Sequence, residues 1–222
     1  MIDGRAVLAI IPARGASKRI PRKNLQPYQG EPLVVHSIRH ALGSRVVDRT
    51  VVSTEDDEIR RVAEAAGATV VRRPLEIAGD TATSESALLH VLDVLRDGEG
   101  WEPELVVFLQ CTSPARTPED IDSAVATLLA EGADSLLSAC PFDKYVWRVG
   151  AEGAEPLNYD YHKRWRDQDF PPQYQENGSI YVFTPELLRA TNNRLGGRIA
   201  VYPMSPENSF QIDHPHDLMH PA

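Results

Sequence analysis

The sequence predicts an α/β fold, a mostly parallel sheet whose strands are joined by crossover helices. Short aliphatic runs alternate with amphipathic stretches along most of the chain, which is the pattern of repeated strand–helix–strand units. The chain has 222 residues, enough for one sizeable core but few for two full domains. Its hydrophobic fraction of 42% and charged fraction of 25% are ordinary for a globular protein. We therefore expect a single domain over residues 1–222.

The first elements follow directly from local patterns. Residues 6–11 form an unbroken aliphatic run bounded by turn residues, which predicts a buried strand. Residues 31–42 have apolar positions at helical spacing, with a proline in the first turn and a glycine just past the end, and predict a helix. A strand over 48–54 then runs into acidic residues that cap an amphipathic helix over 59–66. Residues 68–71 form a third short strand.

The middle of the chain repeats the alternation. Residues 84–95 read as a helix, and 104–110 form the clearest buried strand. The segment 117–120 opens the next helix, because it offers a cap residue, a proline at the first helical position and acids in the first turn. Residues 134–139 form a fifth strand. Ligands of such sheets bind at the carboxyl ends of the strands.

The alternation breaks over residues 141–176, which mix aromatic and charged residues with little helical period. One interpretation is a β-hairpin excursion that packs against a partner subunit, and the other is a lid that packs on its own sheet. The composition suits either, and we favour the dimer. We expect the parallel pattern to resume with a strand over 178–183, a helix over 185–190, a strand over 199–202 and a last helix near 215–219.

The loop after the first strand is the strongest functional signal. It contains Gly15 and two prolines, and no Asp or Glu occurs from Gly4 to Gly30, although the chain carries 32 acidic residues. Cations and backbone amides at the carboxyl end of a parallel strand make a phosphate site. Neither the P-loop pattern nor Gly-x-Gly-x-x-Gly is present, so we expect side chains to hold a nucleoside triphosphate. The cations of the loop are Arg14, Lys18, Arg19, Arg22 and Lys23.

Charge and cysteine content exclude other classes. A net charge of −9 argues against a general nucleic-acid binder, which would carry a basic face. The two cysteines, Cys111 and Cys140, are far apart and in no metal-type spacing, so we expect buried free thiols. No apolar run approaches the ~20 residues of a membrane span, and the N-terminus lacks a signal-peptide pattern. We expect a cytoplasmic protein that does not bind a membrane.

Five segments, in one order, carry a resemblance that covers almost the whole chain. The most specific is Ile-Pro-Ala-Arg-Gly-Ala-Ser-Lys-Arg-Ile-Pro-Arg-Lys-Asn at 11–24, and the others are 52–59, 109–116, 174–181 and 211–213. Together they resemble the acylneuraminate cytidylyltransferases, the CMP-sialic acid synthetases and their relatives. The resemblance implies a Rossmann-like fold of the nucleotide-diphospho-sugar transferase type and a homodimer with an exchanged dimerisation segment. It also implies Mg²⁺-dependent attack of the anomeric hydroxyl of a 2-keto-3-deoxy sugar acid on the α-phosphate of CTP, with loss of pyrophosphate.

The resemblance also assigns roles to individual residues of this chain. The chemistry would centre on Arg14, Lys23 and Asp213, with Asp213 as the Mg²⁺ ligand. The alternative for Asp213 is a helix cap before Pro215. The CTP ligands would be Arg14, Ser17, Lys18, Lys23, Asn24, Thr112, Ser113 and Arg116. The residues that face the sugar acid would be Gln110, Arg166, Gln168 and Asn177.

Three positions depart from the pattern of the family. Arg19 stands where members usually carry glycine, Gln211 where many carry a second acid, and Asp167 where an arginine often precedes the glutamine. The acceptor therefore stays open among N-acylneuraminic, legionaminic, pseudaminic, KDN, Kdo-like and non-sugar acids. A nucleotide-binding relative without turnover is a second class of function. A nucleotide-sugar glycosyltransferase fits the fold but not the position of the triphosphate loop.

Overall fold

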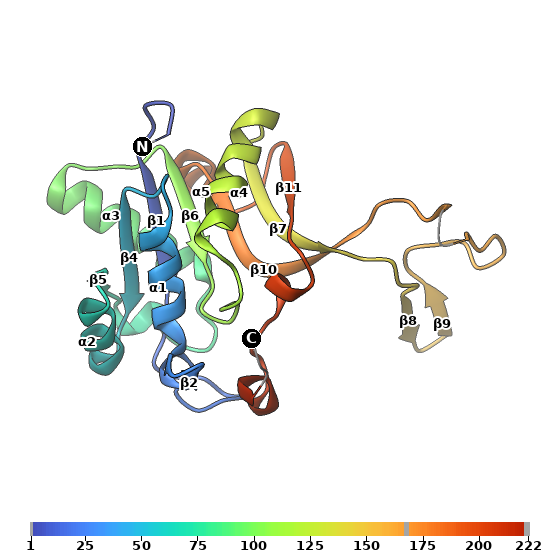
Figure 1. Cartoon of the computed structure of the whole chain (residues 1–222), viewed down its shortest axis with the longest axis horizontal. Coiled ribbons are helices and arrows are strands. Elements are labelled where there is room, and N and C mark those ends of the chain that lie inside the picture. The colour runs from blue at the N-terminus through green and yellow to red at the C-terminus, as the bar shows by residue number, and fades with distance from the viewer. Residues whose placement is uncertain (1, 167–168, 220–222) are drawn as a thin grey trace.

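The computed structural model describes residues 2–166 and 169–219, and in these residues the core is a seven-stranded sheet of order β11-β7-β10-β6-β1-β4-β5 (Figure 1). Every neighbouring pair is parallel except those made by β10, which runs antiparallel to both β6 and β7. The strands are β1 (Val7–Pro12), β4 (Arg49–Thr54), β5 (Thr69–Arg72), β6 (Leu105–Leu109), β7 (Ser135–Pro141), β10 (Tyr174–Phe183) and β11 (Ile199–Pro203).

Helices cover both faces of the sheet. Successive residues of β1 point to opposite faces, so Ile11 packs with the cluster that contains α1, α2 and α4, and Ile10 packs with the cluster that contains α3 and α5. Both residues are fully buried. The parallel strands of the sheet are thus sandwiched between helices, as their aliphatic runs require. The helices are α1 (Leu33–Gly43), α2 (Asp57–Ala65), α3 (Ser84–Glu99), α4 (Pro118–Glu131) and α5 (Pro185–Thr191).

Most element predictions are confirmed to within a few residues, with three corrections. The helix expected at 31–42 begins at Leu33, because β3 (Glu31–Pro32) pairs with β2 (Pro27–Tyr28) in a small hairpin. The expectation that a parallel pattern resumes at 178–183 is wrong. The chain leaves the sheet after β7 and returns beside it without a crossover helix, so β10 runs back antiparallel. The last helix is a 3₁₀ segment, Pro215–Met219.

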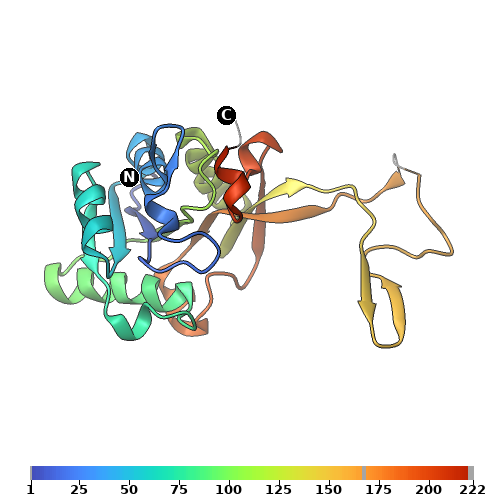
Figure 2. The same ribbon diagram turned by 90° about the horizontal axis from the view of Figure 1, so that it is seen from below.

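The segment between β7 and β10 extends away from the sheet in both views (Figures 1 and 2). It contains the hairpin of β8 (Trp147–Gly150) and β9 (Gly153–Pro156). Its aromatic rings pack on one another, with 4.3 Å between the ring centroids of Tyr145 and Tyr159. The structure therefore contains the expected β-hairpin excursion and does not fold it over its own sheet as a lid, whereas its packing against a partner subunit stays a prediction.

Two further expectations have outcomes in the fold. Both cysteines are free, but only Cys111 is buried, whereas Cys140 is half-buried at the end of β7. In the described part of the chain, no helix has the length and apolar character needed to cross a membrane.

Candidate active site

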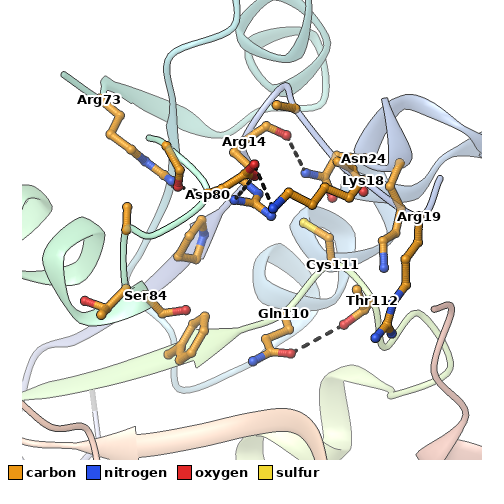
Figure 3. Close-up of a pocket in the computed structure, with 18 residues that line it drawn as sticks. Arg14, Lys18, Arg19, Asn24, Arg73, Asp80, Ser84, Gln110, Cys111 and Thr112 are labelled. Atoms are coloured by element: carbon orange, nitrogen blue, oxygen red, sulfur yellow. Dashed lines mark hydrogen bonds and ion pairs between the residues drawn. The ribbon is translucent and has the colours of Figure 1, made fainter. Parts of the chain in front are cut away.

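A cavity of about 490 Å³ opens at the carboxyl ends of β1 and β6 (Figure 3). Its lining comes from three segments that are far apart in sequence. The loop after β1 contributes Arg14, Ser17, Lys18, Arg19, Lys23 and Asn24; the end of β6 contributes Gln110, Cys111 and Thr112; and the stretch from β5 to α3 contributes Arg73, Asp80 and Ser84. Seven of the residues predicted to bind CTP or the acid therefore meet in one place: Arg14, Ser17, Lys18, Lys23, Asn24, Gln110 and Thr112.

Acidic residues at the start of α2 anchor the loop from outside the cavity. The backbone amide of Gly15 donates to Glu55 Oε1 at 2.7 Å, and a Cβ on this glycine would lie 2.6 Å from Asp56 Oδ2. Arg22 pairs with Asp56 and Glu58 at 3.2 and 2.9 Å. Because this amide already donates to Glu55, a phosphate could use it only by displacing that carboxylate, and its role in phosphate binding stays a prediction. Glycine is required here by close approach to α2, and the side chains of the loop remain for an anion.

Two of the cations that face the cavity, Arg14 and Lys18, pair with one acidic residue. Asp80 lies between the loop cations, with its carboxylate oxygens 3.3 Å from Arg14 Nη1 and 3.0 Å from Lys18 Nζ. Asn24 holds the loop by donating to the carbonyl of Arg14 at 2.9 Å. A phosphate group that binds Arg14 and Lys18 must therefore replace the carboxylate of Asp80. Asp80 is the counter-ion of these two cations.

Replacing Asp80 by asparagine is expected to tighten CTP binding roughly fivefold, because removing a like charge beside a surface-exposed phosphate is worth on the order of 1 kcal/mol. Isothermal titration calorimetry with CTP measures the change. The control is Asp97→Asn, which breaks a surface ion pair with Arg96 outside the cavity and should leave the affinity unchanged. Weaker CTP binding by Asp80→Asn would contradict the competition and would mean that Asp80 organises the loop.

Lys23 and Asp213 form the second charged pair of the site. Lys23 Nζ donates to the carbonyl of Ile212 at 2.8 Å and to Asp213 Oδ1 at 3.0 Å. The Lys23 side chain is 12% exposed, whereas the Asp213 carboxylate is 40% exposed. Asp217, rather than Asp213, accepts the backbone amides of Asp213 and His214 at this turn. The carboxylate of Asp213 is therefore not used as a cap and stays accessible beside the cavity.

Of the residues that follow β6, some lie at the cavity wall and one lies in the interior of the protein. The Thr112 hydroxyl donates to Gln110 Oε1 at 3.4 Å at the cavity wall. Ser113 is fully buried and donates to the carbonyl of Asn177. Cys111 lines the cavity, and burial raises the pKa of its thiol to about 11. Cys111 is therefore a protonated, unreactive wall residue at neutral pH.

Arg116 lies inside the protein, where the structure does not bring it to the cavity. It is 1% exposed, and its guanidinium donates to the carbonyls of Gln110 and Ser179 at 2.8 Å each, and to the hydroxyl of Ser37. Burial lowers its pKa to about 10, so it remains charged at neutral pH. Direct contact of Arg116 with a nucleotide does not fit this placement. Arg116 instead joins the middle of β10 to the end of β6 and to α1.

The residues expected to face the acid are dispersed in a single chain. Asn177 is buried, its Oδ1 accepts from Ser138 at 2.7 Å, and it lines a separate hollow of about 320 Å³ with Gln211. Arg166 pairs with Asp169 at 2.6 Å on the segment that extends from the sheet. Gln168 lies outside the described residues. Of the three residues of this group that the structure describes, only Gln110 reaches the cavity.

Sequence reasoning missed the wall that follows β5. Arg73 is buried and donates to the carbonyl and the hydroxyl of Ser53 at 2.6 and 3.1 Å. Burial lowers the pKa of this guanidinium. Ser84 begins α3 and lies across the cavity from the loop cations (Figure 3). The position of Arg73 directly after a predicted strand was the available signal, because ligands gather at strand ends.

The donor set fits a hard divalent cation only with help from the substrate. In residues 2–166 and 169–219, no group of three or more His, Cys, Asp and Glu side chains could hold a metal. Mg²⁺ commonly binds through one or two carboxylates, with phosphate oxygens and waters completing its shell. The accessible carboxylate of Asp213 beside a cationic cavity satisfies that requirement.

A cavity at the carboxyl edge of a mostly parallel sheet, lined by a cationic loop, is typical of proteins that bind the phosphates of a nucleotide. The cytidylyltransferase family model matches residues 8–220. The chain therefore belongs to the cytidylyltransferase family, as its motifs predicted.

Curated relatives carry the more specific name N-acylneuraminate cytidylyltransferase. One from Oncorhynchus mykiss is 36% identical over 219 residues, which cover 95% of this chain and 48% of the relative. One from Streptococcus agalactiae serotype V is 30% identical over 218 residues, which cover 96% of this chain and 52% of the relative. The chain thus spans about half the length of the curated relatives it matches.

Solved structures confirm the fold type. A CMP:2-keto-3-deoxy-manno-octonic acid synthetase complexed with CTP superimposes with a TM-score of 0.73 at 16% identity, covering 96% of this chain and 95% of that one. A 4-diphosphocytidyl-2C-methyl-D-erythritol synthase from Anaerococcus prevotii gives 0.68 at 13% identity, covering 98% and 96%. The expected nucleotide-diphospho-sugar transferase type is confirmed.

Proposed function

We propose that this protein transfers the CMP group of CTP to the anomeric hydroxyl of a 2-keto-3-deoxy sugar acid of the sialic acid type. The observation that carries the proposal is the set of inward-facing cations, Arg14, Lys18 and Lys23, in one cavity of a cytidylyltransferase fold. The names of the relatives support the choice of CTP and of an acylneuraminate-type acid. The anomeric oxygen bonds to the α-phosphorus as the bond to the pyrophosphate oxygen breaks, and the hydroxyl proton passes to solvent.

The chain contributes placement and charge, which are what phosphoryl transfer requires. Arg14 and Lys18 hold the outer phosphates once Asp80 is displaced, and these are the groups that leave as pyrophosphate. Lys23 neutralises charge that develops on the phosphate nearest Asp213. Bound Mg²⁺ would supply further neutralisation of the phosphate oxygens, and Asp213 is the residue that would hold it.

Replacing Asp213 by asparagine is expected to raise the Mg²⁺ concentration needed for half-maximal turnover at least about tenfold, because a neutral amide is a weaker ligand for a hard cation. Pyrophosphate release measured against Mg²⁺ concentration gives the shift. Glu207→Gln is the control, since Glu207 is an exposed carboxylate of the same C-terminal segment. An unchanged Mg²⁺ dependence would place the metal ligand elsewhere.

A homodimer in the cytoplasm belongs to the same proposal. Trp147, Val149 and Tyr161 are exposed apolar or aromatic side chains on the segment between β7 and β10, with 46, 81 and 55% of their surface accessible, and a second subunit would cover them. Arg166 lies on this segment and would then serve the site of the other subunit. Because the proposed reaction consumes CTP, the protein should work in the cytoplasm, where nucleoside triphosphates are held. Sedimentation equilibrium measures the oligomeric state.

The test of the function is pyrophosphate release with CTP and Mg²⁺ against a panel of 2-keto sugar acids, with ATP, GTP and UTP as nucleotide controls. Release with CTP and one acid establishes the reaction and the acceptor. One observation favours a nucleotide-binding protein without turnover: Gln211 occupies the place of a second acid, and its amide donates to the carbonyl of Asn177. CTP binding by calorimetry without pyrophosphate release would select that alternative.

A further inference from the structure

Arg19 differs from the other cations of the loop after β1 because no acidic side chain among the described residues pairs with it. Arg14 and Lys18 face Asp80, and Lys23 faces Asp213. Arg22, on the outer side of the loop, pairs with acids of α2. Arg19 lines the cavity and is exposed, and no hydrogen bond or ion pair joins its guanidinium to any other residue of 2–166 and 169–219. Its five N–H donors are available to a ligand.

The direction of Arg19 separates it from the triphosphate cations. In Figure 3 its side chain runs toward the end of the cavity formed by Gln110 and Thr112, whereas the side chains of Arg14 and Lys18 converge on Asp80. The free protein therefore has two cationic ends. One is already matched by a carboxylate of the chain, and the other is not.

Gln110 adds a second donor at the Arg19 end. Its Oε1 accepts the hydroxyl of Thr112, and its Nε2 has no hydrogen-bond partner among the described residues. The guanidinium of Arg19 calls for an acceptor that has a negative charge and two oxygens, and the amide of Gln110 is a further N–H donor in the same cavity. A carboxylate meets this need, since it accepts two N–H groups of one arginine side by side.

We propose that Arg19 binds the carboxylate of the acceptor acid, with the amide of Gln110 beside it, and so selects a 2-keto acid over a neutral sugar. This assignment rests on the proposed cytidylyltransferase function. With this assignment, the residue that binds the carboxylate of the acid belongs to the same chain as the cavity. Arg166 cannot do this within one chain, because it lies on the segment that extends away from the sheet. The assignment to Arg19 also leaves Arg14 and Lys18 to the phosphates.

The experiment compares Arg19→Gln and Arg19→Lys with wild type. Pyrophosphate release is measured with N-acetylneuraminate and with 2-keto-3-deoxy-manno-octonate, each varied at saturating CTP, and then with CTP varied. For the acid that the wild type uses, Arg19→Gln should raise KM by about 10- to 100-fold, the range expected for a lost hydrogen bond to a charged group. KM for CTP should change less than about twofold, and Arg19→Lys should fall between, because it keeps the charge without the fork.

Two controls make the result specific. Arg22→Gln removes the same charge from the outer side of the same loop. Any rise in KM that it causes should therefore be equal for CTP and for the acid. The carboxamide of the acid lacks the charge that Arg19 recognises, so wild type and Arg19→Gln should use it equally poorly. Equilibrium binding of the acid to the CTP-loaded protein in Ca²⁺ gives the same comparison without turnover.

The outcomes separate this assignment from the function on which it rests. Suppose that the wild type releases pyrophosphate, but that Arg19→Gln leaves KM for the acid unchanged or raises KM for CTP. That result overturns the role of Arg19 and keeps the proposed function. If Arg19→Gln lowers turnover of the acid and of its carboxamide by the same factor, the role of Arg19 is also overturned. A wild type that neither turns over nor binds either acid overturns both.

Discussion

Replacing Lys23 by alanine is expected to lower kcat by roughly a hundred- to a thousandfold, the range seen when one group that stabilises transition-state charge is removed. The ammonium of Lys23 is nearly enclosed and contacts Asp213 at 3.0 Å. Its loss removes a cation from the phosphate site and also leaves the Asp213 carboxylate to repel the phosphates. The fold should persist, because Lys23 belongs to the loop rather than to the core. Steady-state pyrophosphate release and thermal unfolding measure the two effects.

The pairing of Lys23 with Asp213 permits a sharper test. If the two residues act as one unit, Lys23→Ala combined with Asp213→Asn should lose little more activity than the worse single variant. Arg61→Ala removes a positive charge from the exposed surface of α2 and controls for net charge. Near-normal kcat of Lys23→Ala at saturating CTP would count heavily against the assignment of the triphosphate to this loop.

Local sequence patterns sufficed for most of the fold because the strands are buried on both faces. The run at Val7–Pro12 is continuous and aliphatic for that reason, and it is readable without any tertiary information. The direction of β10 was not readable in this way. It depends on where the chain re-enters the sheet after the β8–β9 excursion, and that is settled by pairing with β6 and β7 over long sequence separations.

The same distinction explains the site. Arg14 and Lys23 were predictable because they follow a recognisable strand and stand in an acid-free stretch. Asp80 was missed because its role depends on a contact with Arg14 across 66 positions of sequence. The hydrogen bond from the backbone amide of Gly15 to Glu55 was not predictable because Glu55 belongs to another element. Residue type and position predict which groups are available, whereas packing decides which of them the protein already uses.

Arg116 shows how far packing can override residue type, and its replacement should have the largest effect on stability. Arg116→Ala is expected to lower the free energy of unfolding by about 4 kcal/mol, since it creates a cavity and also leaves buried acceptors without donors. Arg116→Met fills most of the volume and leaves only the unpaired acceptors, so it should cost about 2 kcal/mol. Both are large against the ~5–15 kcal/mol stability of a typical domain. Urea unfolding followed by circular dichroism measures both values.

The acceptors of Arg116 decide between a structural and a nucleotide-binding role. They belong to Ser37 on α1, Gln110 after β6 and Ser179 on β10, so the side chain joins three elements that are distant in sequence. If this is its role, Arg116→Met should unfold at lower urea and, where folded, bind CTP with wild-type affinity. If Arg116→Met instead had normal stability and bound CTP tenfold more weakly, the result would support the contact between Arg116 and the nucleotide that the sequence predicted. Because the guanidinium is sealed from the cavity by the elements it joins, we expect the first result.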